Sequence, residues 1–272
     1  MRTFAQKEVA PHVQDMDAKQ AIPRSLVDSL FHNGLMGIEI GREYNGAQST
    51  FTGALLAVEE MAKVDPSVSV MLDVHNTLVN TVFNKYGSKM VKEAFLPRLA
   101  TDTLGCFCLS EAGSGSDAFA LKTAAVEDGD HYMISGEKMW ITNSDHAGIF
   151  LVFATVDPSL GYKGITCFAG DGEAPGRLVG KKENKLGIRA SGTCTVSLDK
   201  VRVPKWQVVG EAGKGYKIAI EILNEGRIGI AAQMLGLAKG AFDKAMPYLF
   251  QRRQFDSAIG DFQVPILYTY IY

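Results

Sequence analysis

The spacing of apolar residues changes twice along this chain, and this limits the fold more than any other feature. Over about the first hundred residues, apolar side chains recur every three or four positions, as in 26–35 and 51–62, and this period predicts helices. Between about residues 103 and 210, short apolar runs are separated by Gly and Pro, which predicts strands. The helical period returns from about Gly213, with apolar residues at helical spacing over 218–249.

The order of helices, strands and helices argues against a doubly wound sheet, in which strands and helices alternate. The central strands are short and closely spaced, so they predict a small antiparallel barrel or sandwich. Residues 68–82 are apolar on all sides and predict a buried helix. Residues 149–156 predict a strand covered on both faces.

Composition excludes several classes of function. Of the 272 residues, 46% are hydrophobic and 21% charged, and the formal net charge is −2, so no basic field is present to recruit nucleic acid or an anionic membrane. No apolar run approaches the ~18 residues of a membrane-spanning helix. The five histidines lack the spacing of metal ligands, so we expect no metal site. Cys106 and Cys108 are two apart in an apolar run, and a strand would place both on one face as buried thiols.

Two segments are candidates for cofactor binding. The run Gly113-Ser114-Gly115-Ser116-Asp117 lacks both the third glycine of a dinucleotide-binding fingerprint and the Gly-Lys of a phosphate-binding P-loop. It is typical of a tight turn in a β-domain, and equally of a loop whose bare amides approach a cofactor. Trp140-Ile141-Thr142 ends a strand-like run. Its tryptophan fits either a core position or the face of a flavin, with the Thr142 hydroxyl near a ring nitrogen.

Asn224-Glu225-Gly226-Arg227 precedes a long apolar run, and we interpret it as the opening of a helix with an acid in its first turn. Together with the two segments above, it completes a pattern that resembles the acyl-CoA dehydrogenases. The resemblance runs from the start of the chain to about Gln263. Four segments in order carry it, namely 107–117, 138–143, 183–191 and 224–232. The last two are most similar to the short/branched-chain branch of the family, which acts on 2-methyl short acyl-CoAs.

The resemblance implies a fold of three domains and an FAD cofactor. We expect an N-terminal helical domain over 1–102, a middle antiparallel β-barrel over 103–210 and a truncated C-terminal helical bundle over 211–272. The residues that would line FAD are Phe107, Cys108, Leu109, Ser110, Glu111, Ala112, Gly113, Ser114, Gly115 and Ser116. Its ring would be covered by Trp140, Ile141 and Thr142. The FAD of a neighbouring subunit would be reached by Arg252 and Gln263.

The resemblance also implies α,β-dehydrogenation of an acyl-CoA thioester to a 2-enoyl-CoA. Electrons would pass to an electron-transfer flavoprotein. The family is usually a tetramer and is found in the mitochondrial matrix, although this chain shows no Arg-rich transit segment. Substrate contacts would come from Ser116, Tyr162, Tyr216, Asn224, Glu225, Gly226 and Arg227.

The family removes the α-proton of its substrate with a carboxylate. In most members this glutamate lies in a Tyr-Glu-Gly segment, and no such segment occurs here. Other members place it one residue before the arginine that matches Arg227, where this chain has Gly226. Glu225 is roughly a hundred degrees away around a helix, so we do not expect it to substitute. Because a general base contributes roughly 10²–10⁴-fold, we expect little turnover.

Both ends of the chain depart from the family pattern. Residues 1–8 read as the middle of a helix, and residues 264–272 are apolar, aromatic and interrupted by Pro265, which is typical of a β-prone, aggregation-prone tail. We therefore expect a chain truncated at both ends, with open apolar faces over 218–250. One alternative function is an inert FAD- or acyl-CoA-binding partner of the full-length enzyme. Another is an oxidase or monooxygenase of the same fold, which the sequence of residues 224–227 makes less favoured.

Overall fold

The structure is a computed structural model that describes residues 1–263. Helices form the first third of the chain, as the spacing predicted. They are α1 (Arg2–Phe4), η1 (Ala5–Val9), η2 (Ala10–His12), α2 (Val13–Lys19), α3 (Arg24–His32), η3 (Arg42–Tyr44), α4 (Phe51–Ala62), α5 (Pro66–Asp73), η4 (Val74–Asn80), α6 (Thr81–Tyr86) and α7 (Lys89–Thr101).

The buried helix predicted over 68–82 is confirmed as the continuous run α5–η4–α6, in which η4 is π-helical. Its start has a clear local cause. Asp65 accepts a hydrogen bond from the amide of Val68 at 2.7 Å, and Pro66 occupies the first helical position, where its missing amide is not needed. Ser88 caps α7 in the same way, accepting from the amide of Val91 at 3.2 Å.

The middle third is rich in strands, also as predicted. The strands are β1 (Gly105–Cys108), β2 (Ala124–Asp128), β3 (His131–Thr142), β4 (Ile149–Thr155), β5 (Ile165–Asp171), β6 (Arg177–Val179), β7 (Thr193–Pro204) and β8 (Val208–Val209), with the short helices η5 (Pro158–Gly164) and η6 (Lys205–Gln207) between them. Seven of them follow the order β6-β7-β3-β2-β4-β5-β8, and β1 pairs with β4. Most pairs are antiparallel, whereas β4 runs parallel to both β1 and β2.

Strand β4 is buried along its whole length, which confirms the expected double cover. Ile149, Leu151 and Phe153 face a core shared with α6, α7 and the start of α8. Phe150 and Val152 face a second core, within the sheet-rich domain. A third core joins α2, α3, α4 and α5. The sheet and the N-terminal helices are thus fastened together through β4 and its parallel neighbour β1.

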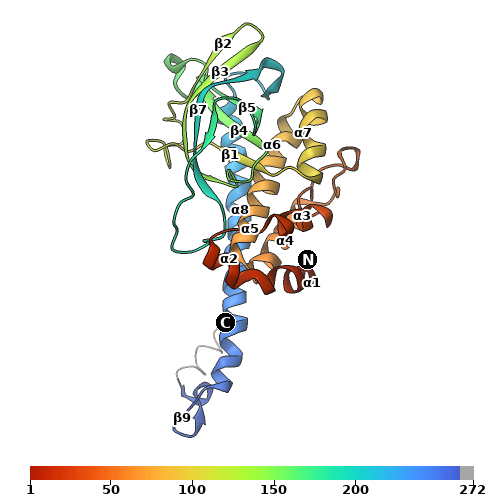
Figure 1. Cartoon of the computed structure of the whole chain (residues 1–272), viewed down its shortest axis with the longest axis vertical. Coiled ribbons are helices and arrows are strands. Elements are labelled where there is room, and N and C mark those ends of the chain that lie inside the picture. Colours follow the sequence, from red (N-terminus) through yellow and green to blue (C-terminus); the bar gives the residue numbers. More distant parts are fainter. Residues whose placement is uncertain (264–272) are drawn as a thin grey trace.

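One continuous helix, α8 (Gly215–Gln251), forms most of the C-terminal region. The part of α8 up to Gly240 lies against β5, α5 and α4, and the rest projects away from the body toward a small hairpin (Figure 1). The hairpin pairs β9 (Arg253–Gln254) with β10 (Ser257–Ala258), and η7 (Ile259–Asp261) follows. Ile228, Leu235 and Phe242 are among the exposed apolar residues of α8, as expected. The predicted tail lies outside the described residues.

The interpretation of 224–227 as a helix opening is wrong, because α8 begins about two and a half turns earlier, at Gly215. This start agrees with the return of the helical period at about Gly213, and Lys214 caps the helix without a side-chain hydrogen bond. Glu225 therefore lies in the helix interior and has no first-turn interaction with the helix dipole. In residues 1–263, no helix is both long enough and apolar enough to cross a membrane.

Candidate flavin and acyl-CoA site

The loop between β1 and β2 carries most of the predicted cofactor residues. Phe107, Cys108 and Leu109 are buried, while the chain from Ala112 to Ser116 is exposed except at Ser114. A tight turn begins the loop, because the backbones of Glu111 and Ser114 exchange two hydrogen bonds, at 2.9 and 3.1 Å. The Ser114 hydroxyl donates to the carbonyl of Asp117 at 2.8 Å. Ser114 thus serves the loop itself.

The two glycines of this turn are not explained by the turn. Neither Gly113 nor Gly115 has a positive φ, and a Cβ on either would meet no atom within 4 Å. Any residue could occupy these positions as far as the chain's own atoms are concerned. Their bare backbones instead face open space. This observation favours the cofactor interpretation over the simple tight turn.

Trp140 lies beside this loop but is not a core residue. Its exposed fraction is 57%, and its φ of 63° is unusual for a bulky side chain. The register of β3 against β7 shifts between Lys138 and Ile141, so a bulge turns Trp140 outward while Ile141 stays buried. Strained backbone in an exposed aromatic residue is often associated with function. The amide of Met139 donates to the carbonyl of Ser110 at 2.9 Å and holds the two segments together.

Two predicted substrate residues meet at the start of α8. The rings of Tyr162 and Tyr216 are 4.9 Å apart, in an edge-to-face arrangement. Phe119, which the sequence analysis missed, is 6.4 Å from Tyr216. Phe119 lines a cavity of about 350 Å³ that is also lined by Gly161, the residue before Tyr162. Ser116 is exposed on the same loop as Phe119.

Gly226 and Arg227 line a second cavity, of about 370 Å³, between η4 and α8. Its other walls are mainly apolar: Val74, Leu78, Leu223 and Ile230, together with Asp73. Gly226 widens the cavity, since a Cβ there would lie 2.8 Å from Leu78 Cδ2. Asn224 accepts a hydrogen bond from the Arg227 guanidinium. Glu225 pairs with Lys85 and does not line this cavity.

Asp73 is a buried carboxylate in the wall of this cavity, and the sequence did not lead us to predict it as a site residue. It is 1% exposed, and its Oδ1 accepts a hydrogen bond from the Thr77 hydroxyl at 3.0 Å. Burial raises the pKa of Asp73 to about 6, and the Thr77 hydrogen bond opposes this shift. The sequence signal was available: Asp73 is the only charged residue between Asp65 and Lys85.

The structure does not bring Arg252 and Gln263 to the other predicted residues. Arg252 ends α8 and Gln263 follows η7, at the far end of the helix from the sheet (Figure 1). Both are exposed. Within one chain, the predicted cofactor residues therefore fall into two separate groups.

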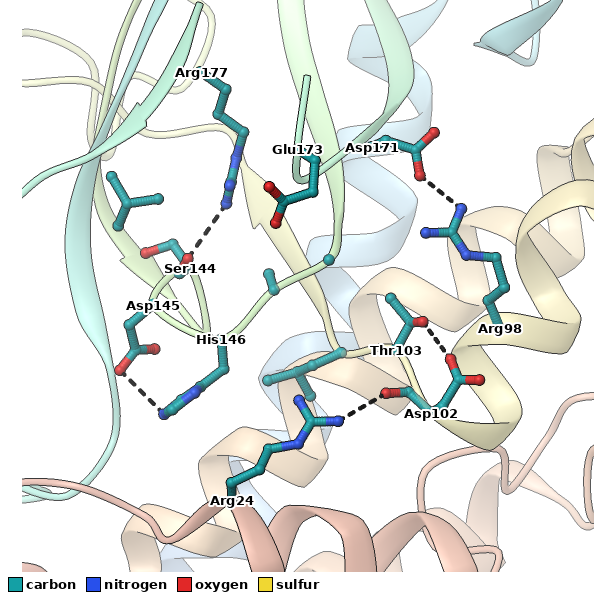
Figure 2. Close-up of a pocket in the computed structure, with 14 residues that line it drawn as sticks. Arg24, Arg98, Asp102, Thr103, Ser144, Asp145, His146, Asp171, Glu173 and Arg177 are labelled. Carbon is teal, nitrogen blue, oxygen red and sulfur yellow. Dashed lines mark hydrogen bonds and ion pairs between the residues drawn. The ribbon is translucent and has the colours of Figure 1, made fainter. Parts of the chain in front are cut away.

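A third cavity, of about 520 Å³, contains none of the predicted residues (Figure 2). Its walls are mainly polar, and several of their polar groups have partners within the chain. Arg98 is 2.6 Å from Asp171, and the Arg177 guanidinium donates to the carbonyls of Gly172 and Ser144 at 2.9 and 3.3 Å. Several polar groups of this wall are thus already partnered within the chain, although the buried Nε of Arg177 has no hydrogen-bond partner among the described residues. The candidate site therefore lies with the loop 110–123, Trp140 and the first half of α8.

Known proteins of one family are similar to this chain over nearly its whole length. The chain matches the models of the acyl-CoA dehydrogenase N-terminal domain over residues 1–103, the middle domain over 106–201 and the C-terminal domain over 213–265. The short/branched chain specific acyl-CoA dehydrogenase of Rattus norvegicus, a mitochondrial protein, is 52% identical over 263 residues. That alignment includes 97% of this chain and 61% of the rat protein. The chain thus spans less than two thirds of this relative.

Two solved structures are also similar. Butyryl-CoA dehydrogenase from Megasphaera elsdenii is 38% identical, with a TM-score of 0.95 over 98% of this chain and 71% of that one. A structure described as "Electron transferring flavoprotein of Acidaminococcus fermentans: Towards a mechanism of flavin-based electron bifurcation" is 37% identical, with a TM-score of 0.96 over 98% and 70%. The chain belongs to the acyl-CoA dehydrogenase family, as its motifs indicated.

Proposed function

We propose that this chain binds FAD against the 110–116 loop and Trp140-Ile141-Thr142, and acts on short or branched acyl-CoA thioesters. The observation that carries this proposal is the pair of glycines, Gly113 and Gly115, whose bare backbones face open space without any need of the fold. Exposed Trp140 lies on the adjoining strand and offers a flat aromatic surface. These features fit a flat cofactor with a phosphate tail.

Each part of the chain would then have a distinct task. The loop amides would approach the diphosphate, Trp140 would cover the ring, and the Thr142 hydroxyl would donate to it. Phe107, Cys108 and Leu109, which are buried in β1 and directly after it, would fix the start of the loop. Bound FAD would supply hydride acceptance, which no side chain can provide. Arg252 and Gln263 would contact the FAD of a neighbouring subunit in a homo-oligomer, which we propose to be a tetramer.

The cavity between η4 and α8 would hold the acyl group. Its apolar walls suit a hydrocarbon, and its volume of about 370 Å³ favours a short or branched chain over a long one. Gly226 and Arg227 would line it, and Asn224 would orient Arg227 through their hydrogen bond. Tyr162, Tyr216 and Ser116 would contact the CoA portion. The reaction would be the α,β-dehydrogenation of the thioester to a 2-enoyl-CoA.

Among residues 1–263 we assign no proton-abstracting base. Gly226 has no side chain, and Glu225 is paired with Lys85 on another face of α8. We therefore propose slow turnover by this chain. The same two residues favour the second candidate function, an inert FAD- or acyl-CoA-binding partner of the full-length enzyme. Co-expression with a full-length enzyme distinguishes the two, since a partner subunit would co-purify with it.

Electron transfer to an electron-transfer flavoprotein and a mitochondrial location complete the proposal. Support for the location comes from the rat relative, whose name includes mitochondrial. Support for the electron acceptor comes from the description of the Acidaminococcus structure. A role in isoleucine catabolism would follow from a 2-methyl acyl substrate.

The test starts with FAD binding by the full chain. After incubation with excess FAD and gel filtration, we expect a bound-flavin absorbance near one per chain, and slow dye reduction with 2-methylbutanoyl-CoA. Gly115→Val should abolish flavin retention without lowering the melting temperature, because its side chain would fill only open space. Gly187→Val is the matched control, since a Cβ on Gly187 also meets no atom within 4 Å. Folded protein that remains colourless would refute the proposal.

A further inference from the structure

Lys138 is a fully buried lysine between the two segments that would flank the flavin. Its exposed fraction is 0%. Its Nζ donates to Glu111 Oε1 at 2.8 Å and to the carbonyl of Leu109 at 3.0 Å. A buried lysine is rare unless it is paired. This one has its charge matched and two of its three donors used.

The Glu111 carboxylate in turn holds the far end of the loop. It accepts hydrogen bonds from the amides of Lys122 and Thr123, at 2.7 and 3.0 Å, and from the Thr123 hydroxyl at 2.6 Å. One carboxylate therefore connects Lys138 with both ends of the segment 111–123. That segment contains Gly113 and Gly115, and the Lys138–Glu111 ion pair holds its two ends together.

Lys138 also lies directly before the second segment. It is two residues ahead of Trp140, at the start of the bulge that turns this ring outward. The next residue, Met139, donates its amide to the carbonyl of Ser110 at 2.9 Å. Two consecutive residues of β3 thus fix the position of the glycine loop relative to Trp140.

Stability alone is a weak explanation for such a pair. Taking both charges out of water is costly, and apolar replacements of buried ion pairs are often neutral or stabilising. Here, however, removing the pair would leave the Leu109 carbonyl and the two loop amides without their partners, so the loop would rearrange. The arrangement is more readily explained as a means of fixing one loop shape.

We infer that Lys138 is a positioning residue: through Glu111 it sets the loop 111–123 and Trp140 in the relative placement that binds the flavin. This inference rests on the proposed function and adds a residue that contacts the loop and not the cofactor. Its loss should weaken flavin binding far more than it weakens the fold.

The test compares Lys138→Met and Glu111→Gln with a control ion pair in the same sheet-rich domain. The control is Lys205→Met, because Lys205 pairs with Glu127 at the surface. Flavin-fluorescence titration of the full chain should give a Kd for FAD at least tenfold higher in both test variants and within twofold of wild type in the control. The flavin absorption band should change shape in the test variants. Lys138→Arg, which keeps the charge, should recover part of the affinity.

Hydrogen exchange gives a readout that does not need flavin. The amides of Lys122 and Thr123 should exchange at least tenfold faster in Glu111→Gln, while the amides of β7 keep their protection. If Lys138→Met does not fold, Glu111→Gln provides the measurement. Folded test variants with wild-type FAD affinity would overturn this inference alone. A wild-type chain that takes up no FAD would overturn the proposed function, and the inference with it.

Discussion

Gly229 faces the carboxylate of Asp73 so closely that a Cβ on it would overlap one carboxylate oxygen and lie 3.0 Å from Cγ. Gly→Ala in a helix interior usually stabilises by about 1 kcal/mol. At this position the overlap should reverse the sign, with a net loss of about 1–3 kcal/mol. Urea denaturation of Gly229→Ala measures this. Gly226→Ala, whose Cβ would meet only the tip of the Leu78 side chain, is the control, and equal stability of both variants would contradict the prediction.

Asp73 should make the protein less stable as the pH rises through the mildly acidic range. Its pKa is raised by burial to about 6 in the folded chain, from an ordinary 3.8. Below pH 3.8, Asp73 is protonated in both the folded and the unfolded state. Between about pH 4 and 6 the unfolded state loses this proton while the folded state keeps it, so the free energy of unfolding falls as the pH rises. The loss is roughly 3 kcal/mol. Asp73→Asn should lack it, so the stability difference between variant and wild type should grow from pH 4 to pH 7.

His75 should act in the opposite direction over an overlapping range. Its Nδ1 accepts from the amide of Gly105 at 3.0 Å, so its Nε2 donates to the carbonyl of Leu99 at 2.9 Å. Burial lowers the pKa of His75 to about 4 from 6.5. As the pH falls from about 6.5 to 4, the unfolded state binds a proton first, and roughly 3 kcal/mol of stability is lost. His75→Gln should reduce this acid sensitivity; stability curves parallel to wild type would argue against it.

Trp140 should report flavin binding directly. The chain has two tryptophans, and the other, Trp206, packs against Phe95 of α7 at 6.2 Å. We expect FAD to quench tryptophan fluorescence through Trp140, so Trp140→Phe should remove most of the quenching and Trp206→Phe should retain it. Because Trp140 is exposed, Trp140→Phe should change stability by about 0.5 kcal/mol or less. Full quenching in Trp140→Phe would place the flavin elsewhere.

Hydrophobic spacing was sufficient to predict the helical and strand-rich regions. The period of 3.6 residues is strong over 26–35, and β4 is apolar throughout, so each could be assigned from local sequence alone. The return of the helical period at about Gly213 agrees with the start of α8 at Gly215, but the interpretation of 224–227 as a helix opening was wrong. The first turn of α8 packs against β5, a contact between residues distant in sequence that local spacing does not show.

The site was only partly predictable for the same reason. The glycine loop and Trp140 are visible as motifs, but their exposure is not. Sequence alone left Trp140 between core and surface, and only the bulge in β3 shows that it points outward. Lys138 and Glu111 are 27 residues apart, and nothing local indicates that they meet. The same holds for Asp73 and Gly229, which belong to different helices.

The length of helix α8 separates the two groups of predicted cofactor residues within one chain. At about 1.5 Å of rise per residue, Gly226 and Arg252 are roughly 39 Å apart along its axis. No single small ligand touching Gly226 can extend to the hairpin of its own chain. If both groups of residues contact flavins, each flavin site combines Trp140 of one chain with Arg252 of another. In an oligomer that mixes a Trp140 variant with an Arg252 variant, some sites therefore receive both substitutions and others receive neither. Assembled together, the two variants would regenerate some intact sites by complementation, which neither variant can do by itself.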